Sequence, residues 1–190
     1  MRYRILGSTG LRVSVIGLGT WQFGGEWGRT FSQPEADAIL DKAGELGINL
    51  IDTAECYGDH LSESLIGDYL SRHERSRWLV ATKFGHHFHR FMDRTEGFSA
   101  ADVRQQLEAS LRALRVETID LYQFHSGSDS QLLNEDLWTM LAEQKRAGRI
   151  RHLGISILGK GSEVQAREAR RLGADALQVS ERNVAAIATR

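Results

Sequence analysis

This chain of 190 residues contains a single cysteine, has a net charge near zero and lacks long apolar runs. The single cysteine, Cys56, excludes a disulfide within the chain and suits a reducing compartment. The chain has 24 basic and 25 acidic residues, so its net charge is close to zero. Nothing in this balance indicates a nucleic-acid partner or an anionic membrane surface. The N-terminus lacks the apolar region of a signal peptide, and no run approaches the length of a membrane span. We therefore expect a cytoplasmic protein.

The chain does contain enough apolar material for a core, with 41% hydrophobic and 26% charged residues. Its length predicts a single domain over residues 1–190. Within it we expect a β-hairpin cap over residues 1–14, six strands over residues 15–179 and a divergent tail over residues 180–190. Two short strand-like pieces around Gly7-Ser8-Thr9-Gly10 predict the hairpin.

Strand-like and helix-like segments alternate after the hairpin. Apolar runs such as Val15–Thr20 predict buried strands that end near positions 20, 52, 83, 124, 156 and 179. The intervening helices carry recognisable starts, including the capping boxes Ser32 with Glu35 and Ser162 with Gln165. Such alternation is typical of a parallel sheet, either a doubly wound open sheet or a closed eight-stranded barrel.

Three ionisable side chains at consecutive strand ends distinguish these architectures. Asp52, Lys83 and His125 each stand where a strand gives way to its loop. In a barrel these ends converge on one mouth, whereas in a doubly wound sheet distant strand ends do not all meet. We therefore expect a barrel with a site at its mouth.

A dinucleotide-binding fingerprint is the main competing interpretation, and it fails. Gly17-Leu18-Gly19 follows a strand, but Gln22 stands where the third glycine belongs. The capped helix begins more than ten residues later.

The strand-end residues form a plausible acid–base set with Tyr57 in the loop after Asp52. A phenol has an ordinary pKa of about 10, so we expect the Lys83 ammonium to lower the pKa of Tyr57. Asp52 would keep Lys83 charged, and His125 could hydrogen-bond and polarise a substrate carbonyl. Hydride for such a carbonyl has to come from a cofactor.

Several motifs, in order, resemble the aldo-keto reductase superfamily. The resemblance is carried by Gly19-Thr20-Trp21, Asp52-Thr53-Ala54-Glu55-Cys56-Tyr57-Gly58, Ala81-Thr82-Lys83-Phe84-Gly85, Asp120-Leu121-Tyr122-Gln123-Phe124-His125 and Ile150-Arg151-His152-Leu153-Gly154-Ile155-Ser156. The second of these resembles the family signature Asp-Thr-Ala-x-x-Tyr-Gly. The match runs from about residue 3 to Val179.

The resemblance implies NADPH-dependent reduction of an aldehyde or ketone. Tyr57 is implied as the proton donor, with Asp52 and Lys83 tuning it and His125 orienting the carbonyl. The residues implied around the cofactor are Gly19, Thr20, Trp21, Asp52, Ser156 and Gln178.

The chain, at 190 residues, is shorter than the family pattern requires. A closed barrel of this type takes about 250 residues, whereas six strand–helix units fit here. We therefore expect an α/β fold of the (β/α)8 TIM-barrel type, incomplete, with a hairpin cap. The resemblance ends abruptly after Val179, which favours truncation or omission over gradual divergence. The alternative function is a non-catalytic relative that does not bind cofactor alone and acts through a partner, and self-association could cover its open edges.

Metal binding is not predicted. His86-His87-Phe88-His89 offers suitable ligand types, but the segment reads as a loop and no acidic or cysteine neighbour completes a site. We expect Cys56 to be an inert small side chain near the site.

Overall fold

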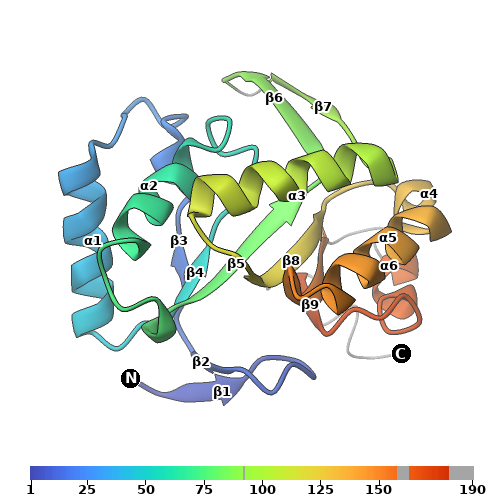
Figure 1. The fold of residues 1–190 in the computed structure, drawn as a ribbon, viewed down its shortest axis with the longest axis horizontal. Helices are drawn as coiled ribbons and strands as arrows, with labels where there is room; N and C mark the ends of the chain where they lie inside the picture. The colour runs from blue at the N-terminus through green and yellow to red at the C-terminus, as the bar shows by residue number, and fades with distance from the viewer. Residues whose placement is uncertain (92, 158–162, 180–190) are drawn as a thin grey trace.

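A parallel sheet of six strands forms the centre of the part of the chain that the computed structural model describes, residues 1–91, 93–157 and 163–179 (Figure 1). The predicted tail 180–190 and the predicted cap Ser162 lie outside these residues. The strands, in spatial order, are β3 (Leu18–Gly19), β4 (Leu50–Asp52), β5 (Leu79–Phe84), β8 (Ile119–His125), β9 (Ile150–Ile157) and β10 (Ala176–Val179).

Strand order follows chain order from one edge of the sheet to the other. A doubly wound sheet reverses its order at a switch point, and no reversal occurs among the described strands. The sheet also curls. Its curvature is seen in the hydrogen bond of 3.0 Å that Gln178 on β10 donates to Asp52 on β4, four strands away. The predicted barrel-type architecture, incomplete at six strands, is confirmed.

Helices cover the outer face of the curled sheet (Figure 1). They are α1 (Gln33–Glu45), α2 (Leu61–Leu70), α3 (Ala100–Leu114), α4 (Asp129–Leu132), α5 (Glu135–Arg146) and α6 (Glu163–Glu168), with short 3-10 turns η1 (Trp21–Gly24) and η2 (Arg75–Arg77). The predicted capping box of Ser32 and Glu35 opens α1, and Gly47 with a φ of 78° follows its end.

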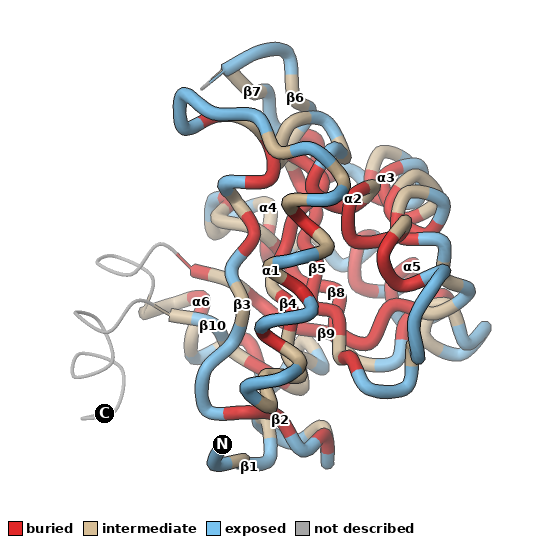
Figure 2. Tube along the Cα trace, turned by 90° about the vertical axis from the view of Figure 1, so that its left-hand side faces the viewer, coloured by how far each residue is buried: buried red, intermediate tan, exposed pale blue. Residues whose placement is uncertain are grey.

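The core lies between the helices and the strands β5, β8 and β9, as the buried segments in Figure 2 show. Tyr122, Phe84 and Phe124 are fully buried there. Inside the curl, Leu50, Ala81, Leu121, Ala176 and Gln178 line part of a cavity of about 170 Å³. Two-sided burial explains why these strands read as continuous apolar runs.

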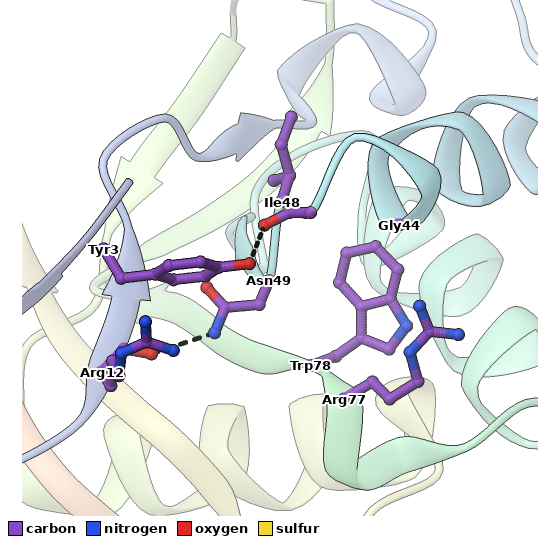
Figure 3. Close-up of a pocket in the computed structure, with 8 residues that line it drawn as sticks. Tyr3, Arg12, Gly44, Ile48, Asn49, Arg77 and Trp78 are labelled. Atoms are coloured by element: carbon purple, nitrogen blue, oxygen red, sulfur yellow. Dashed lines mark hydrogen bonds between the residues drawn. The ribbon is translucent and has the colours of Figure 1, made fainter. Parts of the chain in front are cut away.

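The predicted hairpin cap is confirmed as β1 (Tyr3–Ile5) paired antiparallel with β2 (Arg12–Ser14). Figure 3 shows how it attaches: the Tyr3 hydroxyl donates to the Gly47 carbonyl at 2.8 Å, and Asn49 Nδ2 donates to the Arg12 carbonyl at 3.0 Å. The Arg12 guanidinium also lies over the Tyr3 ring at 4.1 Å. The hairpin thus closes the end of the sheet opposite the strand ends that carry the site.

Three local predictions are corrected by the structure. The run Val15–Thr20 is not a buried strand: only Leu18–Gly19 is strand, and Val15 and Ile16 are exposed on the edge side. His86–His89 is not a loop but part of β6 (His86–Arg90), which pairs with β7 (Asp93–Glu96).

The third correction concerns helices. The sequence also predicts one helix over about Leu133 to Ala147, but that helix begins at Glu135 as α5, because Asn134 has an extended backbone and its side chain caps the Asp136 amide. The short α4 lies before Leu133 and is not among the predicted helices. The helix that the Ser162 and Gln165 capping box predicts is expected to end at Gly173, but α6 ends at Glu168 and turns continue to Gly173. Among the described residues, no helix is both long enough and apolar enough to span a membrane.

Candidate active site

Lys83 hydrogen-bonds both the Asp52 carboxylate and the Tyr57 phenol, the two groups that the sequence placed at one strand end. Its Nζ donates to Asp52 Oδ1 at 2.6 Å, to the Thr53 carbonyl at 2.7 Å and to the Tyr57 hydroxyl at 3.3 Å. Strands β4 and β5 are neighbours in the sheet, so the ends that carry Asp52 and Lys83 lie side by side. His125 at the end of β8 completes the group, with its ring edge-on to Tyr57 at 6.2 Å between centroids.

The Lys83 ammonium is stabilised although its side chain is almost wholly buried. Burial works to lower the pKa of Lys83, but the Asp52 charge and the neighbouring phenol outweigh it and raise that pKa above 10.5. Lys83 is therefore charged at neutral pH, as predicted.

The pKa of Tyr57 moves opposite to the sequence prediction. Burial raises it above the ordinary value of 10.0, and the Lys83 charge, which lowers it, offsets only part of that effect. The prediction counted the ammonium but not the loss of hydration around the phenol. Tyr57 therefore carries its proton at neutral pH.

His125 is uncharged in this environment. Burial, and then the charge of Lys83, holds its pKa well below the ordinary 6.5. A neutral imidazole keeps one nitrogen as a donor and one as an acceptor, so the ring can hydrogen-bond a carbonyl oxygen without carrying charge.

The loop that carries Tyr57 is fixed by close backbone packing. Gly58 has a φ of +68°, and a Cβ there would lie 2.3 Å from the Gly24 carbonyl oxygen, so a larger residue would separate the Tyr57 loop from η1. Ser62 Oγ accepts from Thr53 Oγ1 at 2.9 Å and donates to the Thr20 carbonyl at 3.0 Å.

The predicted cofactor residues lie in different surroundings. Gly19 is exposed on β3, and Thr20 is buried, donating from its Oγ1 to the Asp52 carbonyl at 2.9 Å. Trp21 is half-buried and stacks on Tyr57, with 5.8 Å between ring centroids and 21° between planes. Trp21 therefore forms one wall beside the phenol.

Ser156 and Gln178 come from the strands beyond His125. Ser156 on β9 is the register partner of His125, and it is half-buried. Gln178 on β10 is exposed; it donates to Asp52 Oδ2 at 3.0 Å and accepts from Gln123 Nε2 at 3.2 Å. The curl of the sheet thus brings Gln178 to the same carboxylate that binds Lys83.

Sequence reasoning missed an ion pair that ties three segments together around Tyr57. Arg94 on β7 lies 2.5 Å from Glu26 Oε2 and donates to the Cys56 carbonyl at 3.2 Å. Glu26 in turn accepts from Trp21 Nε1 at 2.9 Å. No spacing in the sequence relates positions 26 and 94, because the β6–β7 hairpin sets their contact.

Comparison with known proteins agrees with the fold. The model of the Aldo/keto reductase family matches residues 15–187. Uncharacterized oxidoreductase YqkF of Bacillus subtilis is 37% identical over 160 residues, which cover 82% of this chain and 49% of that protein. L-galactose dehydrogenase of Arabidopsis thaliana is 35% identical over 158 residues, covering 80% of this chain and 47% of that protein.

Solved structures of the same family share this fold. The structure of PA4992 from Pseudomonas aeruginosa is similar with a TM-score of 0.78 at 32% identity, covering 93% of this chain and 77% of that one. The curled parallel sheet of six described strands is thus a barrel-type α/β fold similar to the TIM-barrel structures of this family. The chain belongs to the aldo/keto reductase family. It spans about half the length of the curated relatives it matches.

Proposed function

We propose that this chain carries the acid–base centre for NADPH-dependent reduction of an aldehyde or ketone to an alcohol. The observation that carries the proposal is the position of Lys83 Nζ, 2.6 Å from Asp52 Oδ1 and 3.3 Å from the Tyr57 hydroxyl. A charged lysine beside a protonated phenol is suited to stabilising negative charge as the phenol gives up its proton.

Each residue has a distinct part in the proposed reaction. Tyr57 holds a proton on its hydroxyl and delivers it to the carbonyl oxygen, while Lys83 stabilises the phenolate that is left. Asp52 keeps Lys83 charged and in place. Neutral His125 donates a hydrogen bond to the same carbonyl oxygen and so orients the substrate.

The residues around this centre fit a nicotinamide. The half-buried Ser156 hydroxyl and the exposed Gln178 amide offer donors and acceptors for a carboxamide, and the Trp21 ring offers an apolar wall beside Tyr57. NADPH, when bound, supplies the hydride that the side chains lack. Gly19 on β3, which pairs with Asp52, and Thr20, whose Oγ1 donates to the Asp52 carbonyl, would support this region.

The test is a fluorescence titration of the chain with NADPH, followed by addition of an aromatic aldehyde and measurement of NADPH oxidation. Tyr57→Phe should still bind NADPH but lower the rate by about 10²–10⁴-fold, since it removes the proton donor. Tyr3→Phe is the matched control, because that phenol hydrogen-bonds Gly47 in the hairpin cap, and it should leave the rate unchanged. Equal rates for Tyr57→Phe and the wild type would refute the proposed role.

A second candidate rests on the sheet edges. Within the described residues, β3 and β10 each pair along one side only, which leaves two edges open to a partner chain. A chain that bound no NADPH at saturating concentration would favour this non-catalytic role, exercised through self-association or another partner. A cytoplasmic location, inferred from the single cysteine, belongs to both candidates.

A further inference from the structure

Two buried side chains of the Tyr57 loop have no part in the proposed reaction. Glu55 and Cys56 fill the two variable positions between Ala54 and Tyr57, and they are 2% and 3% exposed. One carboxylate oxygen of Glu55, the Cys56 sulfur and one ring nitrogen of His125 all lie within 4.8 Å of one another. The fold thus brings an oxygen, a sulfur and a nitrogen near one another, from the loop after β4 and the end of β8. The Glu55 oxygen has to move closer to the other two for all three to bind one ion.

Two of these atoms already have the separation of two ligands on one metal ion. Cys56 Sγ lies 3.8 Å from His125 Nδ1. A zinc ion with bonds of about 2.3 Å to sulfur and about 2.0 Å to nitrogen spans that separation at an angle of roughly 120°, near the tetrahedral value. A weak thiol–imidazole hydrogen bond also explains the distance, but it does not explain the third side chain.

That third side chain supplies an independent observation. Glu55 Oε2 has no hydrogen-bond partner within the described structure, although it is shielded from solvent. Its other oxygen accepts from the His86 amide at 2.8 Å, which anchors the carboxyl group beside the pair. A buried carboxylate oxygen without a partner is costly, and a bound cation would satisfy it.

We propose that Glu55, Cys56 and His125 Nδ1 form a binding site for a zinc-type divalent cation. One thiolate, one imidazole and one carboxylate match the ligand preferences of Zn²⁺ and Co²⁺, whereas Mg²⁺ and Ca²⁺ prefer sites built from oxygen alone. Water takes the fourth position. Burial raises the pKa of Glu55 to about 8, so its carboxyl carries a proton at neutral pH. On binding, the Cys56 thiol and the Glu55 carboxyl each release a proton to solvent as their bonds to the metal form, so the affinity rises with pH.

This site differs from the one considered in the sequence. There the candidate ligands were His86, His87 and His89, and no metal was expected. His87 and His89 lie on the exposed hairpin strand β6, and His86 Nε2 is engaged with the His125 carbonyl at 2.7 Å. In the proposed site, Glu55 and Cys56 are adjacent in the sequence and His125 lies about 70 positions later, where the neighbouring strand ends bring it beside them.

The experiment uses Co²⁺ as a spectroscopic substitute for zinc. The chain is freed of metal with a chelator and titrated with Co²⁺, and the thiolate-to-cobalt charge-transfer absorption is recorded. We expect the band to reach its full height at one equivalent and to disappear when Zn²⁺ is added, because zinc displaces cobalt from such sites.

Variants identify the ligands. Cys56→Ser should abolish the charge-transfer band, and Glu55→Gln should weaken Co²⁺ binding by at least the factor of about ten that losing an outer-sphere partner costs. His89→Ala removes an exposed histidine and should leave the titration unchanged. Circular dichroism and thermal unfolding of each variant establish that it is folded.

Two results would overturn the proposal: no band in the wild type with excess cobalt, or an unchanged band in folded Cys56→Ser. The readout needs neither NADPH nor an aldehyde, so it stands apart from the proposed reductase activity. Cobalt binding without NADPH oxidation would count against the reductase alone, and NADPH oxidation without cobalt binding would count against the metal site alone.

Discussion

Two opposed effects act on the pKa of Tyr57, and their balance decides whether the phenol is protonated at the start of the proposed reaction. Burial raises the pKa of the phenol, while the Lys83 ammonium lowers it and does not fully compensate. A protonated phenol is the form that a proton donor needs, so this balance favours reduction of a carbonyl. Lys83 then acts mainly as the proton leaves, because an ammonium 3.3 Å away stabilises the phenolate that forms.

Replacing Lys83 by methionine tests that balance. Lys83→Met keeps the length of the side chain but removes the charge, so we expect the rate of NADPH oxidation with an aromatic aldehyde to fall by about 10²–10⁴-fold. NADPH fluorescence titration shows whether cofactor binding survives.

Lys42→Met is the control, since Lys42 is exposed and pairs with Glu45 on α1. Its rate should equal that of the wild type. A Lys83→Met enzyme within about twofold of the wild-type rate would mean that Tyr57 works without its ammonium neighbour.

At the scale of elements, Asp175 fastens the base of the half-barrel just before β10. Its carboxylate accepts from Lys145 Nζ on α5 at 2.7 Å and from the Leu153 amide on β9 at 3.0 Å. Its backbone carbonyl accepts from the Ser8 amide in the hairpin cap at 2.9 Å. One residue directly before β10 therefore contacts α5, β9 and the hairpin cap.

The pKa of Asp175 makes this connection dependent on pH. Burial alone would raise that pKa, but hydrogen bonds from Lys145 and the Leu153 amide hold it below its ordinary 3.8. A lowered carboxyl pKa stabilises the fold above pH 3.8, and the stabilisation is lost as the pH falls through the folded-state pKa.

Asp175→Asn should accordingly lower the free energy of unfolding by about 1 kcal/mol at pH 7. The gap from the wild type should shrink below about pH 4, where the unfolded chain begins to protonate this carboxyl, and it should close once the pH falls below the lowered folded-state pKa. Urea denaturation at pH 7 and below about pH 4 measures this difference in the free energy of unfolding. Asp93→Asn, which removes an exposed partner of Arg90, should change little at either pH. A gap that did not vary with pH would show that charge on Asp175 is unimportant.

The elements also show what the sequence could and could not reveal. Consecutive parallel strands place their ends at one edge, so Asp52, Lys83 and His125 could be grouped from strand order alone. The ion pair of Arg94 and Glu26 could not, because it depends on how the β6–β7 hairpin folds over η1. Apolar character likewise did not reveal that Val15 and Ile16 precede an edge strand and are exposed there.

For the whole molecule, the curl of the sheet explains how half a barrel still assembles a site. Gln178 on β10 receives a hydrogen bond from Gln123 on β8 and donates one to Asp52 on β4, so three strands are connected across the concave face. The acid–base group therefore depends on the curl and not on ring closure of the described strands. Among the described strands β3 and β10 each pair along one side only, and their outer backbone edges bear on assembly and not on proton transfer.

Open edges lead to a prediction about assembly. Backbone N–H and C=O groups on an unpaired strand tend to pair with another chain, and exposed apolar side chains beside such a strand favour this further. Ile16 is 57% exposed two residues before β3. We therefore expect the chain to self-associate, with a mass in sedimentation velocity that rises with protein concentration.

Ile16→Lys should shift that equilibrium toward the monomer, because a lysine on a sheet edge opposes pairing with a second edge. Leu46→Lys is the matched control: Leu46 is 56% exposed, but it caps α1 on the outer face, away from either edge. If both variants dissociate equally, general hydrophobicity and not the edge drives association. A wild-type chain that stays monomeric at every concentration would show that the edges are protected without a partner, and the curl that connects Gln178 to Asp52 would then be sufficient for a stable half-barrel.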